Sequence, residues 1–238
     1  MPQNQRKSNV DSWLKKATTR QRKALETASK YFDKGDSLTV NTLEAIYGQE
    51  SGFGSNRRSR GIKGAAGDMQ FEKATAIRVG LKVSKKNDER FDIAKAARAT
   101  ARYLKQLDAS FSKETSLGPN IKTISIQDAD ERKKFVLASI NGGEGRIAQA
   151  QKQTFTAGRN PAKWDDVKEY LKIAGATVSK VKEIGEYVTA LGRYEEEFSR
   201  KSPADKTWKD RPSPLETGSE LDGGHWITKD GKHIYIEN

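Results

Sequence analysis

The segment IYGQESGFG, Ile46 to Gly54, joins the end of an amphipathic helical pattern to a turn rich in Gly and Ser. The helix is expected to begin near Leu38, because apolar residues recur at helical spacing as far as Tyr47. Glycines directly after such a pattern are typical of a helix C-terminus. The pattern therefore places the carboxyl group of Glu50 in the last turn of a helix.

A carboxyl group in this position has two interpretations. The partial negative charge at a helix C-terminus disfavours the ionised form, and so do apolar neighbours such as Phe53 and Met69. A carboxylic acid that keeps its proton near neutral pH can act as a general acid. The alternative is a solvated glutamate at a frayed helix end, and position alone favours this simpler interpretation.

Helical patterning continues along most of the chain, as far as Phe198. Helices are expected over residues 10–32, 38–50, 68–81, 91–108, 128–141, 160–174 and 180–198. Asn160 is expected to cap the helix over 160–174, with Pro161 in its first position. The segments between the helices are expected to be loops, and residues 109–127 hold at most a short extended piece. The predicted fold class is all-α.

Changes in composition predict four segments. They are a basic N-terminal helical segment (1–36), a helical domain (37–198), a linker rich in Pro, Ser and Gly (199–224), and a terminal β-hairpin (225–238). The hairpin is predicted from two alternating runs around Asp230-Gly231, a signal for a type I′ turn. The expected cross-strand pairs are Trp226 with Tyr235 and Ile227 with Ile234. An isolated two-stranded hairpin is marginal in water, so this one is expected to need a partner surface.

Composition excludes several classes of site. The chain has no Cys, which rules out disulfides, thiol nucleophiles and thiolate metal sites. The two histidines, His225 and His233, are expected on opposite faces of the hairpin, so they cannot share a metal ion and no metal site is expected. No run of about 18 apolar residues is present, so no membrane span is expected.

The net charge of +12 favours polyanionic partners, either nucleic acid or anionic polymers of a cell envelope. The Lys and Arg residues are scattered, and aromatic residues are not interleaved with them as in a platform for single strands. Specific nucleic-acid binding is therefore not expected.

Six stretches resemble, in order, the motifs of soluble lytic transglycosylases, lysozyme-like enzymes of the bacterial cell wall that are related to goose-type lysozymes. The stretches are QESGFGSN, KGAAGDMQFEKATAIRVGL, FDIAKAARATARYLKQL, LASINGGEGRI, NPAKWDDV and KEIGEYVTALGRY. They are similar to the family's ES motif, its GAxGLMQ motif, its central helix, its AAYNAGPGRV turn, its Trp-Asp-Val segment and its ETRxYV helix. The resemblance covers roughly residues 38–198 and implies a lysozyme-like fold for them.

The resemblance implies a role for each matching residue. Glu50 would be the catalytic acid, and Ser51 would help to orient the glutamate and the substrate. Met69 and Gln70 stand where the family lines its sugar cleft.

In the later motifs, Asn141 matches the asparagine that binds substrate beside the glutamate, and Tyr187 matches an aromatic residue of the cleft. Gly64, Ala65 and Gly67 would let the backbone turn close to the saccharide. Simpler interpretations remain open: Met69 and Tyr187 as core residues, and Asn141 as a helix-end cap.

The reaction that the resemblance implies is cleavage of the β-1,4 bond between N-acetylmuramic acid and N-acetylglucosamine in peptidoglycan glycan strands. Glu50 would protonate the leaving oxygen and then take the proton of the muramic acid's own C6 hydroxyl as that oxygen closes on C1. The product carries a 1,6-anhydro end, and the implied reaction uses no metal and no cofactor. One carboxyl group suffices, unlike the two that ordinary glycosidases use.

The chain departs from the family's motifs at three positions. Asp68 replaces the leucine of GLMQ, Ile140 replaces the tyrosine of the YN motif, and Glu72 stands about where goose-type lysozymes carry an acidic residue. A second carboxylate, Glu72 or Asp68, would make the chain a hydrolytic lysozyme, unless both side chains point outward on the helix expected there. Loss of the tyrosine keeps open a non-catalytic module that binds sugar or serves assembly.

The hairpin resembles a short C-terminal segment found on bacteriophage and prophage structural proteins. The N-terminus has no pattern of a signal peptide. Together these suggest a chain made in the bacterial cytoplasm and carried in a phage particle or released at lysis, with the hairpin docked on a phage structural protein.

Overall fold

The computed structural model describes residues 8–58, 64–201, 224–229 and 232–237, the last two ranges by their backbone alone. Its described part forms two compact units. The first takes in the residues up to 35, 39–103 and those from 194 on, and the second takes in residues 36–38 and 104–193. Two of the boundaries fall inside long helices, α5 (Ile93–Ser112) and α9 (Val178–Lys201).

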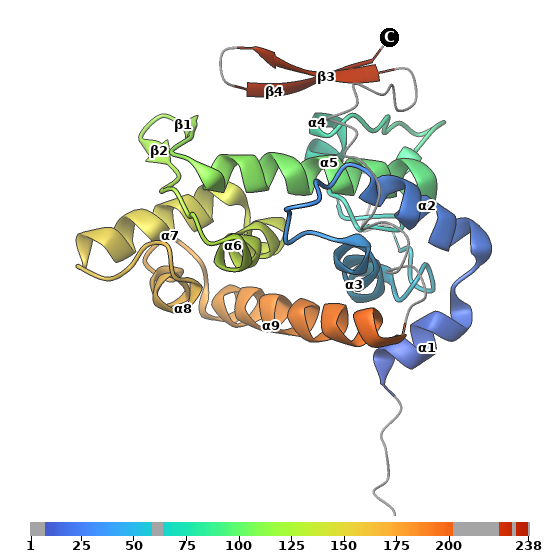
Figure 1. The fold of residues 1–238 in the computed structure, drawn as a ribbon, viewed down its shortest axis with the longest axis horizontal. Coiled ribbons are helices and arrows are strands. Elements are labelled where there is room, and N and C mark those ends of the chain that lie inside the picture. The colour runs from blue at the N-terminus through green and yellow to red at the C-terminus, as the bar shows by residue number, and fades with distance from the viewer. Residues whose placement is uncertain (1–7, 59–63, 202–223, 230–231, 238) are drawn as a thin grey trace, which may run out of the picture. The chain divides into compact units, whose positions relative to one another are not determined.

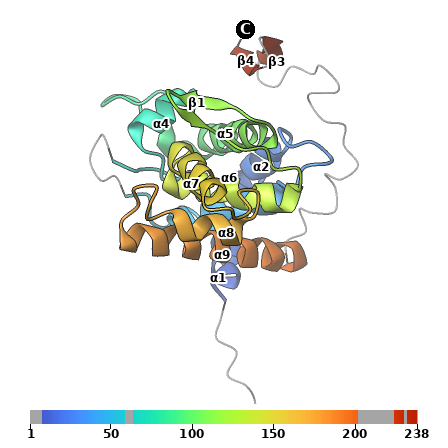
Figure 2. The same ribbon diagram turned by 90° about the vertical axis from the view of Figure 1, so that its left-hand side faces the viewer.

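The predicted all-α class is confirmed for the described residues, which are mostly helical. Besides its share of α5 and α9, the first unit holds α1 (Asn9–Lys16), α2 (Thr19–Ser29), α3 (Val40–Ser51), α4 (Lys73–Arg78) and a 3-10 helix (Glu89–Phe91) (Figure 1). The second unit holds β1 (Ser116–Gly118), β2 (Ile121–Lys122), α6 (Ala129–Gly142), α7 (Glu144–Thr156), α8 (Trp164–Val167) and a 3-10 helix (Lys168–Tyr170). In that unit α7 packs against both α6 and α8 (Figure 2).

The single helix expected over residues 10–32 is wrong, because the chain forms two helices there. Ala17 is extended, and Thr18 starts α2 with a capping box. The Thr18 hydroxyl accepts from the backbone N–H of Gln21 at 3.3 Å, and the Gln21 side chain accepts from the backbone N–H of Thr18 at 2.8 Å. Reciprocal capping of this kind stabilises a new helix start.

The helix expected over residues 68–81 is much shorter than predicted, since α4 begins only at Lys73. Before it, Gly67 and Gln70 have positive φ, at 81° and 48°. Left-handed residues cannot belong to an α-helix, so residues 67–70 form a turn instead. An isolated β-bridge between Ala66 and Phe71 closes that turn.

Two expectations for the second unit also need correction. The loop expected between residues 141 and 160 is wrong over most of its length: only Gly143, with φ 85°, interrupts the helix, and α7 follows it directly. Asn160 caps no helix: its Oδ1 accepts from the backbone N–H of Ala162 at 2.9 Å, and α8 begins at Trp164. The short extended piece expected within 109–127 is present as the pair β1 and β2.

The terminal hairpin has the predicted register. Strands β3 (Gly224–Lys229) and β4 (Lys232–Glu237) are antiparallel, and Trp226 lies opposite Tyr235 as Ile227 does opposite Ile234. The turn residues between the strands lie outside the described residues, and so does the linker expected at 199–224 beyond Lys201.

An aromatic cluster joins α1 and the end of α9 to α3 within the first unit. Trp13 of α1 meets Tyr194 of α9 edge to face at 4.8 Å between ring centroids, and it stacks with Phe198 at 6.2 Å. Phe53, just after α3, lies 5.8 Å from Phe198 and 4.7 Å from Tyr47. The N-terminal helix is therefore part of the core of the first unit, and Figure 1 shows α1 beside the end of α9.

Gly48 of α3 makes this packing possible, because a Cβ there would overlap the Trp13 ring. Gly48→Ala is expected to lower the free energy of unfolding by about 1–3 kcal/mol, since overpacking outweighs the better helix propensity of alanine. Gly192→Ala is the matched control in α9, where a Cβ meets no described atom within 4 Å. That change should stabilise by about 0.5–1 kcal/mol. Chemical denaturation measures both, and equal effects of the two would contradict the packing.

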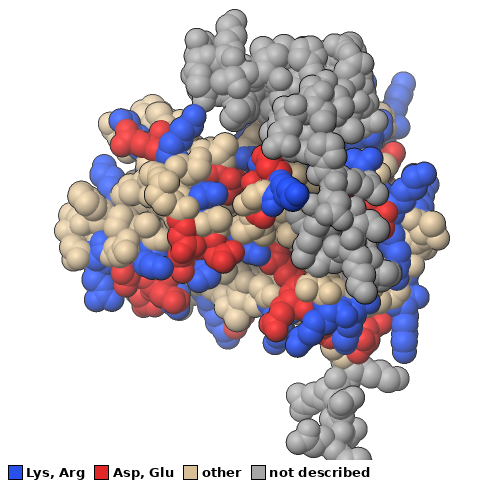
Figure 3. Space-filling view, in the orientation of Figure 1, with Lys and Arg blue, Asp and Glu red and all other residues tan. Residues whose placement is uncertain are grey.

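Charges of both signs are interspersed on the face shown in Figure 3, where the described Lys and Arg side chains alternate with Asp and Glu. The expectation of no specific nucleic-acid binding stays a prediction. None of the described helices is both long and apolar enough to cross a membrane.

Candidate functional site

Glu50 lies in the last turn of α3, as predicted, and its side chain is partly buried. The helix ends abruptly because the next three residues, Gly52, Phe53 and Gly54, all have positive φ, at 57°, 57° and 76°. Glycine adopts this conformation without penalty, but Phe53 does so at a cost of about 1 kcal/mol or more. The Phe53 ring is 3% exposed in the aromatic cluster, and that burial holds the strained turn.

Ser51 is fully buried and closes this turn from inside. Its hydroxyl accepts from the backbone N–H of Gly54 at 3.0 Å and makes a long bond to the Tyr47 carbonyl at 3.4 Å. The side chain therefore fixes the backbone just after Glu50. Its contact with substrate stays a prediction.

The second candidate segment is the turn of residues 64–71, which carries Met69 and Gln70. Met69 is buried, so its core interpretation holds in this structure. Gln70 is partly exposed, and its side-chain amide donates to the Gly67 carbonyl at 2.8 Å. A Cβ at Gly67 would overlap the Arg90 carbonyl, so this glycine is required by protein packing. Closeness of the segment to a saccharide stays a prediction.

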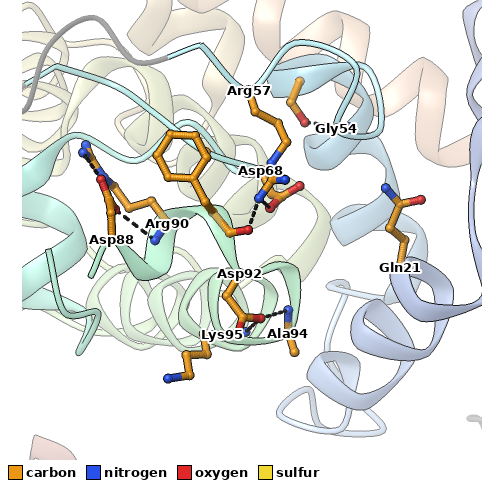
Figure 4. A network of polar contacts seen from close by, with 12 residues as sticks. Gln21, Gly54, Arg57, Asp68, Asp88, Arg90, Asp92, Ala94 and Lys95 are labelled. Carbon is orange, nitrogen blue, oxygen red and sulfur yellow. Dashed lines mark hydrogen bonds and ion pairs between the residues drawn. The ribbon is translucent and has the colours of Figure 1, made fainter. Parts of the chain in front are cut away.

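Arg90, which the sequence analysis missed, organises that turn. The side chain is 1% exposed, and its Nη1 donates to the carbonyls of Gly64 and Phe71 at 2.7 and 3.1 Å. The rest of the guanidinium forms a bidentate pair with Asp88, at 2.9 and 2.7 Å (Figure 4). These hydrogen bonds hold the pKa of Asp88 below its usual value of 3.8.

Asp68 was predicted either to face solvent on a helix or to act as a second carboxylate, and it lies on no helix. The side chain is 4% exposed and points inward. Its Oδ1 accepts from the Tyr47 hydroxyl at 3.1 Å. Its Oδ2 lies 2.8 Å from Nη2 of Arg57, and Figure 4 shows these two residues together. Burial raises the pKa of Asp68, and the nearby Arg57 opposes that shift.

Arg57 is held by the neighbouring chain as well as by Asp68. Its guanidinium donates to the Phe91 carbonyl and lies over the Phe91 ring, 5.3 Å from the centroid. Glu72, the other possible second carboxylate, is exposed just before α4 and makes no side-chain cap there.

Asn141 and Tyr187 belong to the second unit. Asn141 is partly buried in α6, and its Nδ2 donates to Glu183 of α9 at 3.0 Å. Its Oδ1 is buried and finds no hydrogen-bond donor in the described part of the chain. Tyr187 is 5% exposed in α9, as its core interpretation predicted, while Ile140 is partly exposed.

Within the first unit the structure brings the two candidate segments together. Tyr47 lies one helical turn before Glu50, and its hydroxyl bonds Asp68, the residue before Met69. The same hydroxyl accepts from Nε2 of Gln21 at 2.8 Å. Across the described residues, no group of three or more His, Asp or Glu side chains is placed to hold a metal ion.

The chain was compared with known protein families and with curated proteins. The family described as Transglycosylase SLT domain matches residues 28–162, more than half of the 238 residues. This match contains α3, Glu50 and the turn of residues 64–71.

Curated relatives include three proteins named membrane-bound lytic murein transglycosylase F. The one from Desulfosudis oleivorans is 30% identical over 132 residues, which are 55% of this chain and 24% of that protein. Those from Shewanella halifaxensis and Shewanella frigidimarina are 33% and 30% identical over 131 and 148 residues, covering 55% and 62% of this chain. They are matched over 23% and 27% of their own lengths, so the chain spans about a quarter of the curated relatives. With the family matched from the end of α2 to just before α8, the chain belongs to the Transglycosylase SLT domain family.

Proposed function

We propose that this chain is a peptidoglycan lytic transglycosylase that cleaves the MurNAc-β-1,4-GlcNAc bond and leaves 1,6-anhydro-MurNAc ends. Glu50 acts first as the acid that protonates the leaving oxygen. The resulting carboxylate then takes the proton from the C6 hydroxyl of the same muramic acid residue, whose oxygen forms the new bond to C1. Glu50 therefore ends the reaction protonated, as it began, and no cofactor takes part.

The observation that carries the proposal is the position of Glu50. Its carboxyl group lies partly buried in the last turn of α3, inside the family match and directly before a rigid left-handed turn. A general acid must be held within reach of the bond that it protonates, and a fixed helix end supplies that rigidity. The names of the relatives, lytic murein transglycosylases, support the same reaction.

The state of Asp68 favours transglycosylation over hydrolysis. An inverting hydrolase needs a second carboxylate that holds a water molecule in the cleft. Asp68 is buried and engaged with Tyr47 and Arg57, so it is not available for that role. Glu72 is the remaining candidate, and it is exposed just before α4.

The test is release of soluble fragments from purified peptidoglycan by the wild-type chain and by Glu72→Gln. The proposal expects fragment release at the wild-type rate in this variant, because Glu72 has no role in a reaction with one carboxyl group. A loss comparable to that of a Glu50 variant would favour the hydrolytic lysozyme. If the wild-type chain releases no fragments, the remaining hypothesis is a non-catalytic module. Binding of the chain to the same peptidoglycan would then be measured.

We further propose that the hairpin docks the enzyme on a structural protein of a phage particle. Strands β3 and β4 pair with each other in a two-stranded sheet, which leaves an edge of each strand available for strand addition. Deleting residues 202–238 should remove the chain from particles while leaving peptidoglycan cleavage intact. Particles that still incorporate the shortened chain would contradict the docking role.

A further inference from the structure

A chain of hydrogen bonds links the N-terminal helix α2 to both candidate segments of the first unit. Nε2 of Gln21 donates to the Tyr47 hydroxyl at 2.8 Å and to the Phe53 carbonyl at 3.2 Å. The Tyr47 hydroxyl donates in turn to Oδ1 of Asp68 at 3.1 Å. The bonds therefore reach the turn after Glu50 on one side and the residue before Met69 on the other.

These three polar groups meet beside Gly54. A Cβ there would lie 2.7 Å from the Tyr47 hydroxyl and 3.3 Å from both Oδ1 of Asp68 and Nε2 of Gln21. Gly54 is also the residue whose N–H bonds Ser51. The three hydrogen-bonded groups thus lie close to the backbone of Gly54, four residues beyond Glu50.

Each hydrogen bond in this network has a fixed donor and a fixed acceptor. Oε1 of Gln21 accepts from the backbone N–H of Thr18, so its amide end must face Tyr47 as a donor. Burial raises the pKa of Tyr47, and the Asp68 carboxylate raises it further, so the phenol keeps its proton and donates to Asp68. When each hydrogen bond in a network can run in only one direction, the network favours one geometry of the groups that it holds.

Two features of this chain of bonds are not carried by the family motif. Gln21 precedes residue 28, where the family match begins. Asp68 stands where the motif has leucine, a side chain that cannot accept a hydrogen bond from Tyr47. The Gln21 contact thus lies before the matched region, and the Asp68 contact uses a residue that departs from the motif.

We propose that Gln21, Tyr47 and Asp68 are positioning residues that hold the Glu50 turn in register with the turn that carries Met69 and Gln70. None of the three needs to touch substrate. The inference rests on the proposed function, which supplies the reaction that the register serves.

Tyr47→Phe is the sharpest test, because it removes the hydroxyl and keeps the buried ring. We expect kcat on peptidoglycan to fall by about tenfold with KM within about twofold of wild type, since positioning affects the reacting geometry rather than binding. Amide hydrogen exchange at residues 51–56 should become faster. Tyr103→Phe is the matched control in the same unit, where the lost hydroxyl accepts from Arg78 at 3.1 Å. It should change neither readout.

The conservative variants of Asp68 separate positioning from simple stability. Asp68→Asn keeps an oxygen that accepts from Tyr47, whereas Asp68→Leu restores the family residue and loses the acceptor. The kcat of Asp68→Asn is expected to be higher than that of Asp68→Leu. Equal turnover in both, or wild-type kcat and exchange in Tyr47→Phe, would overturn the inference. If the wild-type chain cleaves no peptidoglycan, the proposed function fails, and exchange at residues 51–56 alone still decides whether these bonds hold the turn.

Discussion

Glu50→Gln is expected to lower the rate of peptidoglycan cleavage by about a thousandfold, because the amide can neither give nor take the proton that the reaction moves. The fold should be unchanged. Glutamine has nearly the same size and helix propensity as glutamate, and the side chain is only partly buried at the end of α3. Fragment release and the unfolding temperature, measured on the same preparation, separate the two effects.

Glu26→Gln is the matched control, since it makes the same change at an exposed position of α2 in the same unit. Its rate should equal that of the wild type. If Glu50→Gln retained near-wild-type turnover, Glu50 would not be the acid. An equal loss in both variants would point to a general effect of charge on binding to the wall.

Arg90→Leu is expected to cause the largest loss of stability, about 3–5 kcal/mol. The change removes a buried cation, leaves the carbonyls of Gly64 and Phe71 without their donor and leaves Asp88 without its ion pair. A buried polar group left unsatisfied costs more than the bond itself was worth. Chemical denaturation of wild type and variant measures the loss.

The same substitution at an exposed arginine provides the comparison. Arg200 is 67% exposed in α9 and pairs with Glu196 at 3.6 Å, so Arg200→Leu should change the free energy of unfolding by less than about 1 kcal/mol. Similar losses in the two variants would mean that Arg90 does not organise the turn of residues 64–71.

Local sequence signals predicted the elements whose cause is local. Glycines after an amphipathic pattern placed the end of α3 and hence Glu50, and Asp230-Gly231 predicted the hairpin register. The break between α1 and α2 was also readable, because Thr18 and Gln21 have the spacing of a capping box. The helical periodicity of the apolar residues continues across this break and therefore does not reveal it.

The turn before α4 and the polar network were not predictable in this way. Helical spacing of apolar residues continues through residues 68–72, yet Arg90, about twenty residues later, fixes a turn there. Asp68 similarly depends on Tyr47, which lies 21 residues away. A single sequence does not reveal which residues meet over such separations. The sequence therefore predicted a surface or catalytic role for Asp68 rather than a buried contact.

The most direct test of the account is mass spectrometry of the soluble products from purified peptidoglycan, with wild type and Glu50→Gln compared. The account predicts glycan fragments with 1,6-anhydro-MurNAc ends from the wild type and none above background from the variant. Reducing MurNAc ends, heavier by one water, would contradict the transglycosylase mechanism and turn attention to Glu72 as the base.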